Sequence, residues 1–134
     1  MRQIKFRAKT RYDDDCRWVF GNYCYTNKEQ QIIEFDKPCR IHNIIPLTVC
    51  QSTGLKDKDG TDIFENDFIE IDYKNTSLIM LIFWNKNTGG WSIENIHLID
   101  FIEHNVSDLR FLNGQQQNIK VIGNKIDNPE LIKE

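Results

Sequence analysis

The stretch TGLKDKDGTDIFENDFIEID, residues 53–72, decides how the chain is organised. Its first half is rich in turn residues, and the pair Asp59-Gly60 is typical of a tight turn between apolar segments. Over residues 68–73, apolar and acidic side chains alternate, which is the pattern of a half-buried strand. We therefore expect a polar turn that leads into the first strand of a second structural unit.

Working outward, short apolar or alternating runs separated by turn residues predict a mostly β chain, with α+β character only at its margins. An N-terminal β segment, residues 1–52, is expected to hold antiparallel strands, and residues 53–134 are expected to form a second lobe. Gly21 predicts a kink or bulge in the second strand. The expected strands cover residues 3–9, 18–25, 31–35, 47–50, 68–73, 77–85, 91–96 and 119–122. Short helices are expected near residues 96–104 and 128–132.

The composition is that of a folded globular chain. Its 134 residues are 40% hydrophobic and 11% aromatic, with 3 Pro and 7 Gly. A net charge of −3 does not favour non-specific coating of DNA, which needs many Lys and Arg on phosphates. The N-terminus lacks the apolar core of a signal peptide, and no apolar run is long enough to cross a membrane, so we expect a cytoplasmic protein.

Four segments carry a family resemblance. They are IKFRA (residues 4–8), IIPLTVCQSTGL (44–55), QSTGLKDKDGTDIFENDFIEI (51–71) and VIGNKIDNPELI (121–132). Together they resemble the YopX family, small proteins of Gram-positive bacteria and their phages. The resemblance implies a β-rich fold with an SH3-like small barrel in the C-terminal part, a phage or prophage origin, and no established activity. Lys9 stands where the family often has Trp.

The sequence gives no sign of a metal site or cofactor. Asp57, Asp59 and Thr61 match the first, third and fifth positions of a calcium-binding EF-hand loop, but Asp62 replaces its glycine and Phe68 its final glutamate. The cysteines lack zinc-site spacing, and we expect packed thiols; they are Cys16, Cys24, Cys39 and Cys50. Because nucleophile, zinc-protease and phosphate-loop motifs are also missing, we expect a protein that is not an enzyme.

The run SLIMLIFWN, residues 77–85, is apolar at nearly every position. In a strand, alternate side chains share a face, so the run has two apolar faces. A lobe this small covers both faces with difficulty, which predicts self-association through this strand into a homo-oligomer. The alternative is that the turn stretch or residues 96–112 cover the second face internally. The side chains predicted for the interface are Leu78, Met80, Ile82 and Trp84.

Charged side chains are expected to orient such a contact. Lys5 and Arg7 belong to a basic row that continues to Arg11, and Asp67 and Glu70 to an acidic row. Exposed ion pairs contribute at most about 1 kcal/mol each, so they would set direction more than affinity. The sequence therefore predicts a protein-interaction module with an unidentified host or phage protein as a further partner, and no membrane partner.

A single-stranded nucleic-acid-binding module is the alternative function. Trp84 and Trp91 flank a hairpin loop that contains Lys86, and aromatic side chains beside a cation can stack on bases. The competing interpretation is that both Trp side chains belong to the core.

Overall fold

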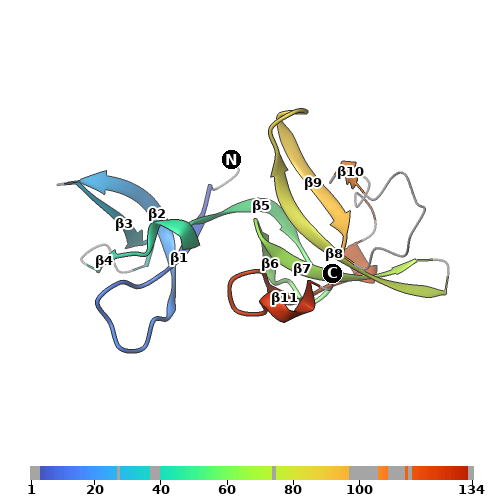
Figure 1. Ribbon diagram of the computed structural model, residues 1–134, viewed down its shortest axis with the longest axis horizontal. Helices are drawn as coiled ribbons and strands as arrows, with labels where there is room; N and C mark the ends of the chain where they lie inside the picture. The colour runs from blue at the N-terminus through green and yellow to red at the C-terminus, as the bar shows by residue number, and fades with distance from the viewer. Residues whose placement is uncertain are drawn as a thin grey trace. The chain divides into compact units, whose positions relative to one another are not determined.

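The computed structural model describes residues 4–26, 28–36, 40–73, 75–96, 106–108, 114 and 116–132. The fold is mostly β, as predicted, and consists of antiparallel strands joined by turns and short 3-10 helices (Figure 1). The chain divides into two compact units, Met1–Gly54 and Leu55–Glu134, called unit 1 and unit 2. Within the described residues, no helix is long and apolar enough to cross a membrane.

Unit 1 is an antiparallel sheet in which sequence neighbours pair. Its strands are β1 (Phe6–Lys9), β2 (Trp18–Thr26), β3 (Glu29–Glu34) and β4 (Ile41–Asn43). The 3-10 helix η1 (Pro46–Thr48) then leads to β5 (Cys50–Lys56), which starts beside β1 and ends beside β6 (Asp62–Phe64) in unit 2. One face of this sheet is the core of unit 1, and it buries Ala8, Val19, Ile32 and Ile44.

Gly21 does not form the expected kink or bulge. It pairs in regular register with Phe6 of β1 and with Glu34 of β3. The backbone of β3 comes so close that a Cβ atom on Gly21 would clash with the carbonyl oxygen of Ile33. The glycine is therefore required by close backbone approach in the middle of a straight ladder.

A methyl group at this position should be costly. We expect Gly21→Ala to lower the free energy of unfolding by about 2–3 kcal/mol, because a backbone atom cannot move aside as a side chain can. The matched control is Gly90→Ala at the start of a strand in unit 2, where a Cβ atom meets open space, and it should stay within about 1 kcal/mol of wild type. Urea denaturation measures both, and equal stabilities for the two variants would contradict the close approach.

Unit 2 contains a five-stranded antiparallel sheet in the order β10-β9-β8-β7-β11. The strands are β7 (Asp67–Tyr73), β8 (Thr76–Asn85), β9 (Gly90–Asn95), β10 (Val106–Asp108) and β11 (Ile119–Asn124). In the described part of the chain, the edge strands β10 and β11 do not pair, so the sheet is not closed and the expected SH3-like barrel is not confirmed.

The two expected helices have different outcomes. The prediction near residues 96–104 lies outside the described residues except for Ile96, which follows β9 in a bend. The prediction near residues 128–132 corresponds to a single 3-10 turn, η4 (Pro129–Leu131), with Pro129 in its first turn as expected. A further 3-10 turn, η3 (Gln116–Asn118), directly precedes β11.

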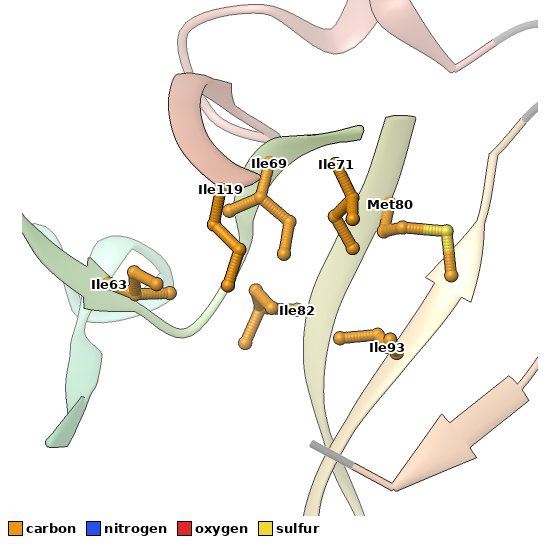
Figure 2. Packing of buried hydrophobic residues seen from close by; sticks show 7 residues of the cluster. All are labelled: Ile63, Ile69, Ile71, Met80, Ile82, Ile93 and Ile119. Atoms are coloured by element: carbon orange, nitrogen blue, oxygen red, sulfur yellow. The ribbon is translucent and has the colours of Figure 1, made fainter. Parts of the chain in front are cut away.

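Both faces of the central strand β8 are covered from within unit 2. On one face, Met80 and Ile82 pack in a cluster with buried isoleucines from neighbouring strands and from β6 (Figure 2). Leu55, at the end of β5, packs against this same cluster. On the other face, Leu81 packs with Phe68 and Ile96, and Leu131 of η4 lies against them. The turn stretch and the C-terminal turn thus supply the cover that we expected a second subunit to provide.

Candidate functional site

The turn at residues 57–61 is held by a buried carboxylate. Asp57 is 2% exposed. Its Oδ1 accepts hydrogen bonds from the backbone N–H of Asp59 and of Thr61, both at 2.9 Å, and its Oδ2 accepts one from Val121 in β11 at 3.0 Å. Two further hydrogen bonds link this turn to β11 and to the 3-10 turn before it: Lys58 N–H donates to the Ile119 carbonyl, and Gln116 Nε2 donates to the Asp57 carbonyl. Asp57 therefore joins segments more than fifty residues apart in sequence.

The hydrogen bonds also set the ionisation of this carboxyl. Burial alone would raise the pKa of Asp57, but hydrogen bonds from Val121, Thr61 and Asp59 together lower it more, so the pKa lies below its ordinary value of 3.8. Backbone N–H groups inside the protein donate hydrogen bonds to the Asp57 carboxylate. Asp57, the first of the positions that match a calcium-binding loop, therefore has a structural role.

Two more polar residues of the resembling segments act in the same way. Asp67 is 1% exposed, and its Oδ2 accepts a hydrogen bond of 2.7 Å from the Phe64 N–H. Asn124 is buried, and its Oδ1 accepts hydrogen bonds from the N–H groups of Ile126 and Asp127. Buried polar groups with such partners stabilise turns. The segments that carry the family resemblance therefore form the internal polar framework of unit 2.

The predicted interface on β8 is largely inaccessible. Met80 is 7% exposed and Ile82 is fully buried, while Leu78 is half-buried and packs against the same cluster. Only Trp84, at 49%, is exposed among the apolar residues of β8. Leu55 and Ile63 already pack on the face of β8 that holds Met80 and Ile82, so the interface prediction loses the uncovered face on which it was based, while self-association itself stays a prediction. Asp67 is buried and therefore does not belong to an exposed partner surface, whereas Glu70 is half-buried beside Lys120 of β11.

The residues of the nucleic-acid alternative do lie together. Trp84 and Trp91 are opposite each other across β8 and β9, with ring centroids 5.0 Å apart in an edge-to-face arrangement. Trp91 is half-buried and packs on the core, so this ring is mainly structural. Lys86 is exposed in the adjoining loop. One exposed ring that leans on a core ring offers little surface for stacking.

A more developed surface lies in unit 1, on the face of the sheet opposite its core. Arg7 pairs with Phe20, and Lys9 pairs with Trp18, so these four side chains share one face. By strand alternation Lys5 belongs to the same face. We call these five residues, Lys5, Arg7, Lys9, Trp18 and Phe20, the basic–aromatic face.

Cations are stacked on the central ring of the basic–aromatic face. Arg7 Cζ lies 4.5 Å from the centroid of the Trp18 ring, and Lys9 Nζ lies 5.0 Å from it. Both distances are within the range of a cation–π interaction. Arg7 is 7% exposed, so its charge is held inside the surface next to the ring instead of projecting from it. The basic row that we predicted from sequence therefore exists, but one of its members is buried.

Apolar surface accompanies these charges. Phe20 is 45% exposed, and Ile41, which belongs to the same face through the pairing of β2, β3 and β4, is 54% exposed. A hollow of about 300 Å³ opens beside Phe20, and its lining includes Lys5, Trp18 and Phe35 together with the acidic residues Glu34 and Asp36. The sequence shows the basic row directly, but not the rings opposite it. Pairing the first two predicted strands as a hairpin would have placed Trp18 and Phe20 there.

The charge of the chain is divided between the units. Residues 1–54 carry nine Lys and Arg against six Asp and Glu, a formal charge of +3. Residues 55–134 carry eight against fourteen, a formal charge of −6. These values add up to the −3 of the whole chain, which hides the difference. The basic–aromatic face thus lies in the positively charged unit.

Comparison with known proteins agrees with the resembling segments. The model of the YopX protein family matches residues 5–133, nearly the whole chain. A solved structure, that of protein EF1440 from Enterococcus faecalis, is 20% identical, with a TM-score of 0.47 over 98% of this chain and 99% of that chain. A search of curated proteins gave no match. On the family match over residues 5–133, the chain belongs to the YopX family.

Proposed function

We propose that this YopX-family chain is a non-enzymatic binding module, an accessory protein of phage or prophage origin, and that it recognises an anionic partner in the bacterial cytoplasm. The observation that carries the proposal is the basic–aromatic face, where Arg7 and Lys9 are stacked on Trp18 next to the exposed ring of Phe20. Exposed aromatic side chains combined with Arg are typical anchors of binding surfaces.

The division of roles between the two units supports this proposal. In unit 2, the buried polar residues Asp57, Asp67 and Asn124 have backbone hydrogen-bond partners, and both apolar faces of β8 are packed. Among the described residues of unit 1, the buried hydrophobic cluster lies on one face of the sheet, and the other face presents rings and cations together. A surface that combines these groups attracts anions and gives them apolar contact.

Self-association through β8 loses its physical basis, because Met80 and Ile82 are buried. We therefore expect Trp84→Ser, which removes the one exposed apolar side chain of residues 78–84, to leave the molar mass in solution unchanged. Size-exclusion chromatography with light scattering at micromolar concentration measures the mass. A wild-type oligomer that dissociates in the Trp84→Ser variant would restore β8 as an interface.

Affinity capture from an extract of a Gram-positive bacterium tests the proposed binding surface. The immobilised baits are wild type, Phe20→Ala and Tyr25→Ala. Tyr25 is the matched control, because it is an aromatic residue of the same strand, 64% exposed, whose side chain alternates to the other face. We expect wild type and Tyr25→Ala to retain the same material, and Phe20→Ala to retain less by about fivefold or more, the cost of losing an aromatic anchor.

The result depends on the difference between variants, not on capture alone. Circular dichroism and thermal unfolding should show that Phe20→Ala is as stable as Tyr25→Ala, since both side chains are substantially exposed. If Phe20→Ala and wild type retain the same material in equal amounts, the basic–aromatic face is not the binding surface and the proposal is wrong. Nuclease treatment of the retained material then separates nucleic-acid partners from protein partners.

A further inference from the structure

We infer that the anionic partner of the basic–aromatic face is single-stranded nucleic acid, with phosphates at the accessible cations Lys5, Lys9 and Arg11 and bases stacked on the rings of β2, while the buried Arg7 holds Trp18 in place. This inference rests on the proposed function, because it names the ligand class of the same surface. The inference depends on the pairing of β1 with β2, which places Arg7 opposite Phe20 and Lys9 opposite Trp18. Cations on one strand and rings on its neighbour combine a basic row with stacking rings, as proteins that bind single strands do.

Phe20 and Trp18 differ in how accessible they are to a stacking base. Phe20 is 45% exposed and offers the more accessible ring. Trp18 is half-buried and positioned by Arg7 and Lys9, so its orientation is set before any ligand arrives. The adjoining hollow of about 300 Å³ is at the small end of ligand pockets, and its lining combines Lys5 and the rings of Phe20 and Phe35 with the acidic residues Glu34 and Asp36. A base stacked on the rings there would place its phosphate on the Lys5 side, away from the carboxylates of Glu34 and Asp36.

A second pair of cation and ring extends the track beyond β1. Arg11 Cζ lies 4.9 Å from the centroid of the Tyr12 ring, and Tyr12 is 70% exposed. Tyr12 has a positive φ of 70°, an unusual backbone state for a bulky residue, which turns the chain sharply after the basic row. The exposed acidic run that follows, Asp13-Asp14-Asp15, ends the positive surface. The track therefore runs from Lys5 to Arg11 and stops there.

The same features favour single strands over the other anionic partners. A duplex hides the faces of its bases, so exposed rings would gain nothing from it. Duplex binding also relies on many phosphate contacts, and a short row with three accessible cations, Lys5, Lys9 and Arg11, supplies few of them. An acidic protein surface would satisfy the cations, but its carboxylates leave Phe20 without a flat partner. Base stacking uses both the charges and the rings.

Fluorescence anisotropy with labelled oligonucleotides of deoxythymidine and of uridine, each about 20 nucleotides long to exceed a typical site, tests the inference. We expect binding at about 20 mM salt that weakens as salt rises, because phosphate contacts release counterions. Phe20→Ala should weaken binding about tenfold through lost stacking. Lys9→Gln should weaken it and lower the salt dependence by about one unit of slope.

Three further variants make the test specific. Tyr25→Ala should bind like wild type, because its ring is on the other face. Trp84→Ser should also bind like wild type, and a loss of binding there would place the site on the β8–β9 hairpin and overturn the inference. The triple variant Asp13→Asn, Asp14→Asn, Asp15→Asn should bind more tightly, because it removes the negative charges that border the track.

Two negative results remain distinguishable. If no oligonucleotide binds at low salt while extract capture still depends on Phe20 and resists nuclease, the ligand is a protein, and the nucleic-acid inference fails while the proposed function stands. If oligonucleotides bind but neither Phe20→Ala nor Lys9→Gln changes the affinity, both the inference and the assignment of the surface are wrong. Measuring the unfolding midpoint of each variant confirms that losses of affinity are not losses of fold.

Discussion

Truncating either Phe68 or Ile82 to alanine should lower the free energy of unfolding by about 3–5 kcal/mol, the typical cost of a large cavity in a packed core. Both side chains are fully buried, but they lie in different clusters on opposite faces of the sheet in unit 2. The free energy lost comes from the removed apolar contacts and from the cavity that remains. Equal severity on the two faces is expected only if the chain covers both of them itself.

Urea denaturation followed by tryptophan fluorescence measures these variants. Leu47→Ala is a suitable control, because Leu47 is 92% exposed and its truncation should change stability by less than about 0.5 kcal/mol. A Phe68→Ala protein that loses less than about 1 kcal/mol would contradict the packing on that face, since no cavity of normal cost would have formed. In that case the original idea of a face awaiting a partner would regain support.

The second large effect is expected at Asp57. Replacing Asp57 with Ala should lower the free energy of unfolding by about 3 kcal/mol, because the backbone N–H groups of Asp59, Thr61 and Val121 lose a charged acceptor. Asp57→Asn should lose about half as much, since an amide keeps one acceptor oxygen but brings an N–H₂ group toward a donor. Thermal and urea unfolding measure both variants.

Asp59→Asn is the matched control for the loss of the hydrogen bonds that the Asp57 carboxylate accepts. The two residues lie in the same turn, but Asp59 is exposed and contributes its backbone N–H, which the substitution preserves. It should therefore unfold like wild type. If Asp57→Ala and Asp59→Asn are equally mild, the turn does not depend on the buried carboxylate, and the structural role assigned to the resembling segment is wrong.

The same carboxylate makes stability depend on pH in the acid range. The pKa of Asp57 in the folded protein lies below its ordinary value of 3.8, so unfolding is accompanied by a gain of protons in acid. Its stabilising contribution is complete above the unfolded pKa and disappears as the pH falls through the folded one. Asp57→Asn should therefore lose less stability than wild type between about pH 5 and pH 2. Parallel acid-unfolding curves for the two proteins would contradict this linkage.

Local patterns along the sequence predicted most of the strands. Runs of alternating or continuous apolar residues at 18–25, 31–35, 68–73, 77–85 and 119–122 correspond to β2, β3, β7, β8 and β11. The glycine in β2 was misread, since it marks close approach of a neighbouring strand and the ladder there is regular. The irregularity lies in β11, between Val121 and Gly123. Whether a strand glycine marks a bulge or a close contact depends on its neighbour, which the local sequence does not specify.

The candidate site shows the same limit more sharply. The apolar character of β8 was clear, but whether its second face was covered depended on Leu55 and Leu131, which lie far from it in sequence. Likewise, the acidic row was clear, but burial of Asp57 and Asp67 depends on the chain folding back over them. Charge patterns identify ionisable side chains, but they do not show which of them are buried and hydrogen-bonded inside the protein. The basic row was the reverse case, because its partner rings became evident only from strand register.

One measurement tests most directly the claim that recognition occurs on the basic–aromatic face while the family-resembling turn is structural. A photoactivatable phenylalanine analogue is placed at Phe20, at Tyr25 or at Asp59, all exposed, and the protein is irradiated in bacterial extract. The account predicts a discrete cross-linked product from position 20, and none from position 25 or position 59. A product that forms from position 59 and not from position 20 would contradict it.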